Sequence, residues 1–399
     1  MNRIVVVGGS LAGLRAVEAL RRSGYDGRLT MIGAEPWLPY DRPPLSKEMI
    51  SGEWERDKTV LRKTPYEELE LELRLGVPAV ALDLGERTVT LAEGTCLPFD
   101  GLVIATGSTP RRLPNQPDLG GVVLLRTIDD CAEIRERLDA RPRVCVIGAG
   151  FIGAEVASSC RARGLDVTLL EALPAPMVRG LGERLGTLLG DMHRDHGVDL
   201  RCRVTVETFE GSGRVERVRL DDGSTIDADL VVVGVGVAPE TRWLEDSGLR
   251  LDDGVVCDET LVAAPGVVAA GDVARWPNAM FDGELMRLEH WTNAIEQGVY
   301  VSARLLAGDA VPEPFAPVPF VWSDQYDLKI QTSGRFRADD DMEVVHGSLE
   351  ERRFTALFGR AGRLVGALAF SMPRQLMQFR RMVGERASLE DAIARARTQ

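Results

Sequence analysis

The sequence predicts an α/β protein built from two similar halves and a smaller C-terminal α/β module. A strand, a glycine-rich turn and a helix occur at residues 3–24 and again at residues 143–164, and each copy continues into a second strand. A proline-rich stretch, VPEPFAPVPF from Val311, follows the two halves. The tail beyond it, of roughly 80 residues, is long enough to form an added module.

Each copy has the pattern of a βαβ unit. In the first, RIVVVGG is typical of a buried strand, apolar residues recur with helical spacing over residues 11–20, and RLTMIGAE supplies the next strand. The second copy repeats this order as RVCVIGAG, FIGAEVASSCRARG and LDVTLLE, with Gly164 ending the helix. The repeat therefore predicts two domains of one architecture.

Shorter strands complete each half and the tail. In the first half, the buried run GLVIATGSTP is preceded by two strand-like segments, LRLGVPAVALDL and RTVTLAEG. In the second half, DLVVVGVGVAPET is preceded by VDLRCRVTVETFEG and RVERVRLDDGS. Each half is thus expected to carry a β-meander before its last strand. In the tail, FVWSDQYDLKIQTSG, DMEVVHGSL and RFTALFGRAGRLVGALAF predict strands, and the segment from Pro373 onward predicts a helix.

Composition excludes several classes of function. The 48 basic and 61 acidic residues give a formal net charge of −13, which disfavours nucleic acid or an anionic membrane as the main partner. No apolar run approaches the ~18 residues of a membrane span, and the chain begins directly with a strand instead of a signal peptide. We therefore expect a cytoplasmic protein.

The metal-binding and redox-active residue types have no motif spacing. The six cysteines form no CxxC pair, so we predict neither a zinc site nor a redox-active disulfide and interpret all six as small buried hydrophobes. His193 and His196 have a helical spacing that could suit a metal, but no third ligand is near. We interpret these two histidines as part of a solvated helix face and predict no metal.

The glycine turns point to dinucleotides. In the second copy Gly148, Gly150 and Gly153 form the GxGxxG pattern of a Rossmann-like domain, in which a pyrophosphate lies at the helix N-terminus. In the first copy Gly8 and Gly13 are kept and Ser10 replaces the middle glycine. Two copies in one chain indicate that two different dinucleotides meet in the protein.

A carboxylate ends the second strand of each copy. Glu35 and Glu171 stand where an acid accepts hydrogen bonds from ribose hydroxyls. Glu171 would repel a 2′-phosphate, and no arginine follows it immediately, so NAD is preferred over NADP.

Further motifs resemble a known superfamily. The ATG of residues 105–107 closes the first half, and Asp272 in the GDVA turn can accept a hydrogen bond from a ribityl chain. Together with the glycine turns these resemble the glutathione-reductase-like flavoproteins with two dinucleotide-binding domains. That resemblance implies FAD in the first copy and NADH/NAD in the second.

A closer resemblance rests on at least six motifs in the expected order. The four that carry the closer match are PYDRPPLSK from Pro39, GAGFIGAE from Gly148, EHWTNAIEQG from Glu289 and WSDQYDLKIQ from Trp322. From about residue 3 to about residue 380 the chain is similar to the NADH-dependent ferredoxin reductases of Rieske oxygenases and cytochromes P450, the putidaredoxin reductase and biphenyl dioxygenase reductase group. This implies an FAD-binding domain at 1–110 and 240–317, an NAD-binding domain at 111–239 and a reductase module at 318–399.

The family resemblance also implies site residues. Lys47 is expected beside the flavin and Glu155 opposite it across the nicotinamide pocket, where a cation stabilises the charge of a reduced ring and a carboxylate offsets the cost of burying that cation. Trp291 and Trp322 are expected at the edges of the flavin pocket. The remaining cofactor-binding residues that we predict are Gly8, Ser10, Leu11, Ala12, Gly13, Glu35, Arg42, Ala105, Thr106, Gly107, Arg126, Gly148, Gly150, Phe151, Ile152, Gly153, Glu171, Arg179, Gly234, Gly271, Asp272, Glu289, His290 and Ala294.

The positions of the cysteines exclude the thiol-dependent reactions of this superfamily. Disulfide reductases of this superfamily carry a cysteine pair early in the chain, and peroxidases and coenzyme A disulfide reductases carry one cysteine near the position of Lys47, whereas the first cysteine here is Cys96. The resemblance therefore implies hydride transfer from NADH to FAD and single electrons passed on to a ferredoxin. The alternatives are an NADH oxidase and a flavoprotein similar to apoptosis-inducing factor, which acts through partner binding.

The partner expected from the resemblance is a small acidic [2Fe–2S] or [3Fe–4S] ferredoxin, which feeds a cytochrome P450 or Rieske oxygenase. The chain itself is expected to be a monomer or a weak homodimer. Because the partner is acidic, we expect a local basic docking surface despite the acidic whole. Its candidate residues are Arg287, Arg335, Arg337, Arg374, Arg380 and Arg381.

Overall fold

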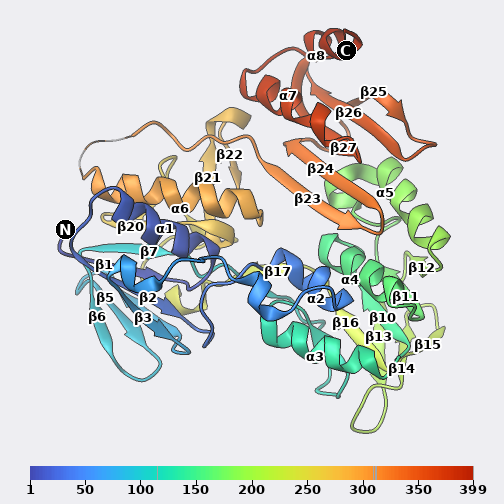
Figure 1. The fold of residues 1–399 in the computed structure, drawn as a ribbon, viewed down its shortest axis with the longest axis horizontal. Coiled ribbons are helices and arrows are strands. Elements are labelled where there is room, and N and C mark those ends of the chain that lie inside the picture. The colour runs from blue at the N-terminus through green and yellow to red at the C-terminus, as the bar shows by residue number, and fades with distance from the viewer. Residues whose placement is uncertain (115, 309, 311, 399) are drawn as a thin grey trace. The chain divides into compact units, whose positions relative to one another are not determined.

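The computed structural model describes residues 1–399 other than 115, 309, 311 and 399 (Figure 1). The chain divides into two compact units. Unit 1 consists of Met1–Asp41, Thr59–Thr109 and Ala238–Phe320; unit 2 consists of Arg42–Lys58, Pro110–Val237 and Val321–Gln399. The expected proline-rich stretch begins at Val311, which lies outside the described residues; its remainder belongs to unit 1.

Unit 1 is centred on a six-stranded sheet in the order β19-β20-β7-β1-β2-β3. Apart from β19, which is antiparallel to β20, neighbouring strands run parallel. The strands are β1 Arg3–Val7, β2 Arg28–Gly33, β3 Leu71–Leu75, β7 Gly101–Ile104, β19 Val262–Ala264 and β20 Val267–Ala269. The apolar runs predicted as strands are buried in β1, β2 and β7, as expected for a parallel sheet covered on both faces.

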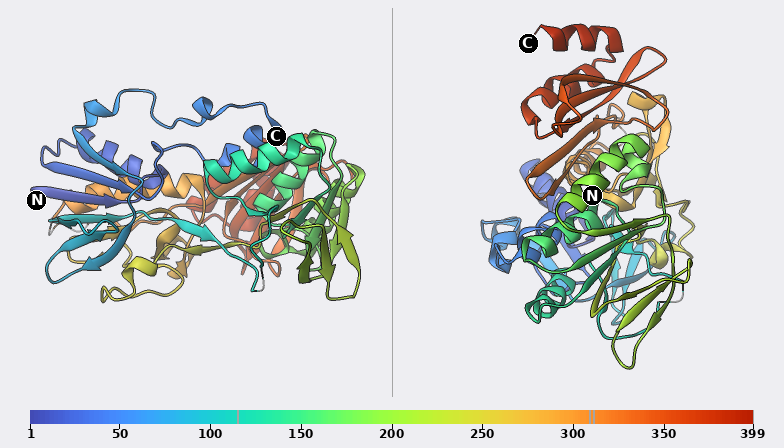
Figure 2. Two further views of the ribbon diagram at one scale, coloured as in Figure 1. Left: turned by 90° about the horizontal axis from the view of Figure 1, so that it is seen from below. Right: turned by 90° about the vertical axis from the view of Figure 1, so that its right-hand side faces the viewer.

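Two helices of unit 1, α1 (Leu11–Arg22) and α6 (Trp291–Leu306), lie side by side (Figure 2). Small residues permit the close approach: a Cβ added at Gly298 would lie 2.5 Å from the carbonyl oxygen of Ala12. The Ser302 hydroxyl also donates to the Ala16 carbonyl oxygen across this contact, at 2.9 Å. The helix that follows the first glycine turn is thereby fixed against α6.

Short strands complete unit 1. The predicted meander is present as β4 Ala79–Asp83, β5 Thr88–Leu91 and β6 Cys96–Pro98, all antiparallel. A second three-stranded sheet consists of β18 Val255–Val256, β21 Ala274–Asn278 and β22 Glu284–Met286. The remaining pair is β8 Ser108–Pro110 with β17 Val237–Pro239, where the chain leaves and re-enters the unit.

Unit 2 contains the second parallel sheet, in the order β12-β11-β10-β16-β9. Its strands are β9 Val122–Leu124, β10 Val144–Ile147, β11 Val167–Glu171, β12 Asp199–Cys202 and β16 Leu230–Val233. The helices are α2 Glu48–Ser51, α3 Ile128–Asp139, α4 Phe151–Ala162 and α5 Val178–Asp195, and the meander is β13 Val206–Glu210, β14 Arg217–Leu220 and β15 Thr225–Asp227. The expected repeat of sheet, helix and meander is therefore confirmed.

The C-terminal module adds a five-stranded sheet and two helices to unit 2. The sheet order is β23-β24-β27-β26-β25, with β23 Phe320–Gln325, β24 Leu328–Gly334, β25 Asp341–Ser348, β26 Arg353–Arg360 and β27 Arg363–Phe370. The helices α7 (Pro373–Gly384) and α8 (Leu389–Arg397) follow. The strands and the helix predicted for the tail are thus present.

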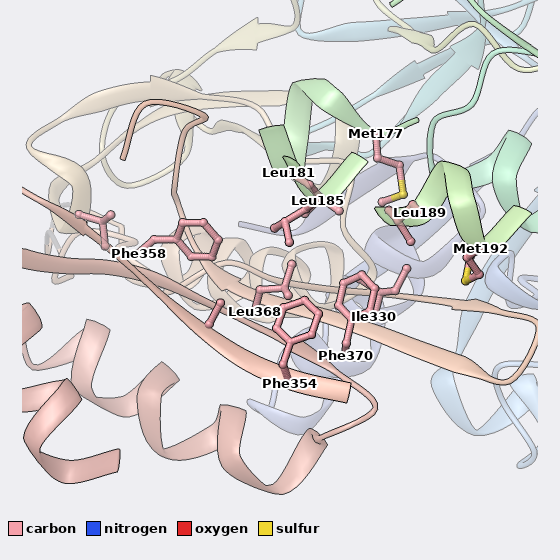
Figure 3. Packing of buried hydrophobic residues seen from close by; sticks show 12 residues of the cluster. Met177, Leu181, Leu185, Leu189, Met192, Ile330, Phe354, Phe358, Leu368 and Phe370 are labelled. Carbon is pink, nitrogen blue, oxygen red and sulfur yellow. The ribbon is translucent and has the colours of Figure 1, made fainter. Parts of the chain in front are cut away.

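Helix α5 packs against the sheet of this module (Figure 3). Helix α5 is kinked at Gly182, whose φ of +79° is not helical. Beyond the kink, Leu185 and Leu189 lie four residues apart on one helix face, and with Leu181 they belong to the same buried cluster as Phe354 and Phe370 of the sheet. Burying each such side chain contributes roughly 1.5–3 kcal/mol, so the cluster binds the module firmly to helix α5.

Three sequence expectations differ from the structure. Residues 42–58, expected within the 1–110 segment of the FAD-binding domain, belong to unit 2, where Ser46 and Leu45 accept hydrogen bonds from Ser159 and Cys131. Cys96 is exposed on the short strand β6 and Cys202 is half-buried, so not all cysteines are core residues.

The third difference is His193, which is fully buried because it continues the apolar face of α5; only His196 of the two histidines is exposed. Among the described residues no group of three or more His, Cys, Asp and Glu is arranged to hold a metal ion. No helix of the described chain is long and apolar enough to cross a membrane.

Candidate functional site

The first glycine turn is built by backbone contact. Gly8 has a φ of +132°, and a Cβ there would lie 2.0 Å from the carbonyl oxygen of Ala105. A Cβ at Gly13 would lie 2.0 Å from the carbonyl oxygen of Gly8. Both positions therefore require glycine. Ser10 has an extended backbone as the residue before α1, and its carbonyl oxygen accepts the Leu14 amide at 2.9 Å, so serine is accommodated there without positive φ.

Glu35 is held in place by Tyr40, which was not predicted as a site residue. Glu35 follows β2, and the hydroxyl of Tyr40, which is 7% exposed, donates to its carboxylate. Tyr40 lies within the PYDRPPLSK motif, and this position could have marked it as a site residue. A carboxylate has about four acceptor sites and can accept from several donors at once, as a ribose site requires.

Asp272 is positioned through its side chain and through the backbone of the residue before it. The Ser108 hydroxyl donates to Asp272 Oδ2 at 2.8 Å, and the preceding amide of Gly271 donates to Gln297 Oε1 at 2.7 Å. Ala294 of α6 lies beside Gly271. In the ATG turn the Thr106 hydroxyl donates to the carbonyl oxygen of Glu240 at 2.7 Å.

The contact with Ser108 gives a testable expectation. Ser108→Ala should weaken FAD binding by roughly three- to tenfold, because Asp272 loses the donor that fixes its rotamer, a hydrogen bond worth about 1 kcal/mol. The measurement is the dissociation constant of FAD from the reconstituted apoprotein by fluorescence. Thr109→Ala, which removes the neighbouring exposed hydroxyl, is the control; equal affinities for both variants would contradict the role of Ser108.

The EHW motif begins α6. Trp291 is the first residue of the helix, and its Nε1 donates to Asp41 Oδ1 at 2.7 Å. His290 precedes the helix as its N-cap residue. Glu289 pairs with Arg287 at 2.7 Å.

Arg287 does not suit the docking surface expected for it. Its side chain is only 9% exposed, and it contacts Asp253 at 3.3 Å as well as Glu289. The carboxylates on both sides neutralise the cation within the fold, which the spacing of charges in the sequence could not indicate.

The second glycine turn repeats the first with a full set of glycines. Gly148 has a φ of +96°, and a Cβ there would lie 2.3 Å from the carbonyl oxygen of Gly234. A Cβ at Gly153 would lie 1.9 Å from the carbonyl oxygen of Gly148. A Cβ at Gly150, in contrast, would meet no atom within 4 Å. The turn therefore leaves open space at the N-terminus of α4, which fits a pyrophosphate. Phe151 and the exposed Ile152 form the first turn of that helix.

Glu171 lies at the end of β11 with its carboxylate fixed. Oε2 accepts the Ala149 amide at 2.8 Å, and Oε1 accepts the Leu173 amide at 2.9 Å. These contacts place a negative group beside the glycine turn. Arg179, near the start of α5, is exposed.

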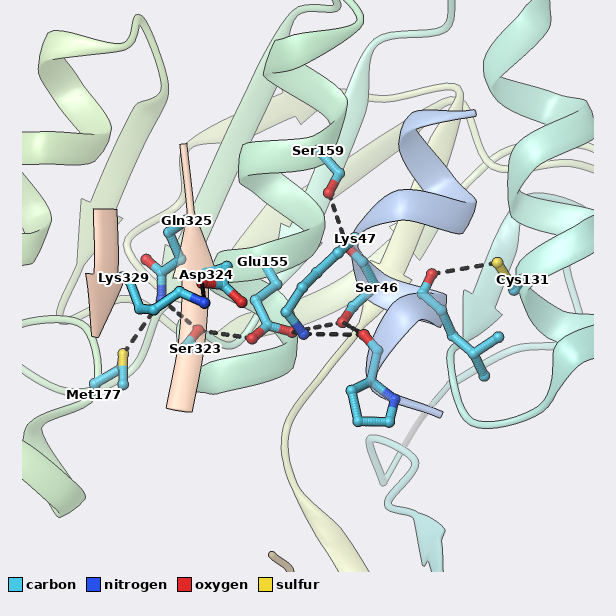
Figure 4. A network of polar contacts seen from close by, with 12 residues as sticks. Ser46, Lys47, Cys131, Glu155, Ser159, Met177, Ser323, Asp324, Gln325 and Lys329 are labelled. Atoms are coloured by element: carbon cyan, nitrogen blue, oxygen red, sulfur yellow. Dashed lines mark hydrogen bonds and ion pairs between the residues drawn. The ribbon is translucent and has the colours of Figure 1, made fainter. Parts of the chain in front are cut away.

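Lys47 and Glu155 form a buried ion pair (Figure 4). Lys47 Nζ lies 2.8 Å from Glu155 Oε2 and also donates to the Pro43 carbonyl oxygen at 3.0 Å. The hydroxyls of Ser46 and Ser323 donate to Oε2 and Oε1 of the same carboxylate, at 2.5 Å and 2.7 Å. Neither serine was predicted as a site residue.

Burial and the hydrogen-bonding partners of Glu155 have opposite effects on its pKa. The residue is 3% exposed, and burial raises the pKa of its carboxyl above the usual value. The charge of Lys47 and the three hydrogen bonds act to lower this pKa and oppose the effect of burial. The carboxylate thus depends on its partners to remain charged.

Three further predicted residues lie in unit 2. Arg42 donates to the Arg126 carbonyl oxygen at 2.6 Å, and the Arg126 amide donates to Asp130 Oδ2 at 2.9 Å. Trp322 is half-buried on β23, one residue before Ser323. The structure therefore brings together Gly8, Gly13 and Ala105 around the first turn and Gly148, Gly153 and Gly234 around the second.

Two family descriptions match the chain. The family described as pyridine nucleotide-disulphide oxidoreductase matches residues 2–298, and the family described as reductase C-terminal matches residues 320–398. The chain belongs to the pyridine nucleotide-disulphide oxidoreductase family. The fold class predicted from the sequence, with two dinucleotide-binding domains and a C-terminal α/β module, is thereby confirmed.

This oxidoreductase is similar to named ferredoxin reductases over nearly its full length. Rhodocoxin reductase of Rhodococcus erythropolis is 36% identical over 384 residues, which cover 95% of this chain and 89% of the relative. The ferredoxin–NAD(+) reductase component of the p-cumate 2,3-dioxygenase system of Pseudomonas putida is 36% identical over 393 residues, covering 98% and 95%. The resemblance inferred from the four motifs is confirmed.

A solved structure agrees with these relatives. The oxidoreductase matches the crystal structure of the covalent putidaredoxin reductase–putidaredoxin complex with a TM-score of 0.93 and 30% sequence identity, covering 100% of this chain and 99% of the other. The similarity includes the C-terminal module as well as both glycine turns.

Proposed function

We propose that this oxidoreductase binds FAD, takes a hydride from NADH and passes single electrons to a small iron–sulfur ferredoxin that supplies a cytochrome P450 or a Rieske oxygenase. The observation that carries the proposal is the full-length match to reductases of such systems. All six cysteines, each of which the structure describes, are free thiols. The chain therefore offers no disulfide to carry electrons away from the cofactor.

The FAD site that we propose lies on unit 1, because its glycine turn, Glu35 and Asp272 have the backbone contacts and fixed carboxylates that a dinucleotide needs. The NADH site that we propose lies on unit 2, where Gly150 leaves open space and Glu171 is fixed beside the turn. When bound, FAD accepts two electrons from a hydride and releases them one at a time.

The role that we propose for the ion pair is electrostatic. Lys47 supplies a positive charge for a cofactor that gains negative charge on reduction, and Glu155 holds that cation at a fixed place. Neither residue is needed as an acid or base, because hydride transfer moves no separate proton.

The experiment is NADH oxidation by the purified FAD-loaded protein in air, with and without a [2Fe–2S] ferredoxin and cytochrome c as the final acceptor. A ferredoxin reductase oxidises NADH slowly in air alone and much faster when ferredoxin is added. Equal rates with and without ferredoxin would identify an NADH oxidase and overturn the proposal.

We propose that the ferredoxin docks on the exposed face of α7. Arg374 and Arg381 lie seven residues apart on this helix, with Met377, 52% exposed, between them. Arg381 also pairs with the exposed Glu385 at 2.7 Å, but the two arginines outnumber this one carboxylate. A face with net positive charge around an apolar side chain fits an acidic protein, and opposite charges accelerate encounter at low salt.

The double variant Arg374→Glu and Arg381→Glu should raise the KM for ferredoxin by roughly tenfold and flatten its dependence on salt, because the steering charge is reversed. Reduction of FAD by NADH should not change. The control reverses Arg217 and Arg219, two exposed arginines of the β14 strand. If both double variants give the wild-type KM and salt slope, ferredoxin docks elsewhere.

A cytoplasmic location is also part of the proposal. It is supported by the free cysteines, since disulfides are rare in a reducing compartment.

A further inference from the structure

His193 has a specific partner inside unit 2. Its ring is fully buried, and Nδ1 lies 2.8 Å from the hydroxyl of Tyr326. Tyr326 follows β23 in the WSDQY motif, and the exposed His196 stacks on its ring at a centroid distance of 3.8 Å. The electron transfer from NADH to ferredoxin that we propose above has no role for this buried imidazole.

A second set of contacts leads from Glu155 toward His193. The Ser323 hydroxyl donates to Glu155 Oε1 at 2.7 Å, and Gln325 Nε2 donates to the Ser323 oxygen at 3.1 Å (Figure 4). Ser323 and Gln325 are two residues apart on β23, so they point to the same face of the sheet, and both are fully buried. Met177 Sδ accepts from the same Gln325 nitrogen at 3.7 Å, which supports this orientation of the amide.

Gln325 and His193 close the gap between the two sets. Gln325 Oε1 and His193 Nε2 are both buried, and neither has a hydrogen-bond partner in the described chain, so each can supply what the other lacks. The two side chains are near enough for a hydrogen bond with Gln325 to raise the pKa of His193, although burial dominates and lowers that pKa to about 4. This link is the weakest of the series, because it does not reach full hydrogen-bond geometry.

The direction of every link follows from Glu155. An ionised carboxylate only accepts, so Ser323 must donate to it and can accept from the Gln325 amide nitrogen. The Gln325 carbonyl then faces His193 Nε2, which must carry the ring proton. His193 Nδ1 is left as an acceptor for the Tyr326 hydroxyl. A neutral His193 with its proton on Nε2 has the donor and the acceptor that all four links require, in agreement with its lowered pKa.

We propose that these side chains form one chain of donors that ends on Glu155 and keeps its carboxylate charged and fixed toward Lys47. Its members in order are Tyr326, His193, Gln325 and Ser323. Hydrogen bonds aligned in one direction polarise one another, so the outer members strengthen the last bond without touching the carboxylate. They are positioning residues, and their importance for catalysis rests on the proposed function of the Lys47–Glu155 pair.

Few other charges act on this chain. Glu155 faces Lys47 and the Ser46 hydroxyl at its other oxygen. His193 faces His196, whose charge acts to lower the His193 pKa. Arg161 acts in the same way on the pKa of Tyr326, which burial raises. A pH dependence of the chain is therefore expected to come from Glu155 itself.

The test measures the ionisation of Glu155 directly. Infrared titration of the FAD-loaded protein, with Glu155→Gln subtracted, gives the protonated-carboxyl band of this residue against pH. Ser323→Ala should raise the Glu155 pKa by about one unit or more, because the ionised form loses a donor. Tyr326→Phe keeps the ring and should give a smaller rise in the same direction, although its hydroxyl makes no contact with Glu155.

A second readout connects the chain to the reaction. In stopped-flow reduction by NADH, both variants should lose rate toward low pH and recover toward high pH, since a protonated Glu155 no longer balances Lys47. Failure of the wild-type protein to accept electrons from NADH would overturn the proposed function, whereas the infrared titration would still test the chain.

Ser333→Ala is the matched control. Ser333 is a fully buried serine on β24, and its hydroxyl has no partner in the described chain, so its removal should leave the Glu155 pKa unchanged. A Tyr326→Phe variant with the wild-type Glu155 titration would overturn the proposal and leave Ser323 as a local partner only. An equal shift in Ser333→Ala would also overturn it, because the effect would then be one of general packing.

Discussion

Replacing Lys47 by methionine is expected to slow NADH-dependent reduction of the bound flavin by about tenfold or more, since the reduced cofactor loses a fixed cation. The same change should lower the free energy of unfolding by about 3 kcal/mol near neutral pH, because it leaves the charge of Glu155 buried without its ionic partner. Both side chains are largely buried, at 12% and 4% exposure, so solvent cannot replace the lost contact. Stopped-flow spectroscopy and urea unfolding measure the two effects.

The loss of stability in Lys47→Met should grow as pH rises. Burial already raises the pKa of Glu155 above its usual 4.5, and removing Lys47 raises it further. Below the usual value the carboxyl is protonated in the folded and unfolded states, and the missing cation costs little. Above the raised folded pKa it is ionised in both states, and the whole cost of a buried, unpaired charge is present. The difference in melting temperature between wild type and variant should therefore be small near pH 5 and largest near pH 8.

The double variant Lys47→Met/Glu155→Gln is the control for this pH dependence. It removes the charge together with its partner, so its deficit in stability should be nearly independent of pH. A Lys47→Met deficit that is equally flat would show that Glu155 is not the titrating group. If neither Lys47→Met nor Glu155→Gln alters flavin reduction, the pair is structural only.

The glycine turns could be predicted from sequence because their requirement is local. Gly8 and Gly148 have positive φ and approach a neighbouring backbone more closely than any Cβ allows, so residue identity alone marks the position. Apolar runs likewise predicted the strands of both βαβ units and the strands of the tail. The pairing of Lys47 with Glu155, in contrast, was inferred only from the resemblance, since the two residues are 108 positions apart.

The remaining contacts of the site depend on tertiary packing that the pattern does not encode. Ser46 and Ser323 reach Glu155 from 109 and 168 residues away and carry no spacing signal of their own. His193 is different, because it lies four residues after Leu189 and so continues the apolar face of α5. Applying the helical period to residues 185–193, beyond the kink at Gly182, would have predicted a buried histidine, whereas we had interpreted His193 and His196 as a solvated pair.

Replacing Glu171 by arginine is expected to raise the ratio of kcat/KM for NADPH over NADH by tenfold or more, with each decade worth about 1.4 kcal/mol. The wild-type carboxylate can pair with ribose hydroxyls and repels a 2′-phosphate, whereas arginine attracts the phosphate. Glu171 also accepts the amides of Ala149 and Leu173, so the turn itself loses two hydrogen bonds in the variant. We therefore expect part of the change to appear as weaker use of NADH.

Two further variants separate charge from turn geometry at Glu171. Glu171→Gln keeps one acceptor oxygen and removes the charge, so its ratio should lie between those of wild type and Glu171→Arg. Glu207→Arg makes the same change of charge at an exposed position on β13 and should leave the ratio unchanged. Steady-state kinetics with both nucleotides at constant ionic strength measure the three ratios. At physiological salt a charge is screened over about 8 Å, so a distant charge should have little effect on the choice of nucleotide. If Glu207→Arg changed the ratio as much as Glu171→Arg, Glu171 would not belong to the nucleotide site.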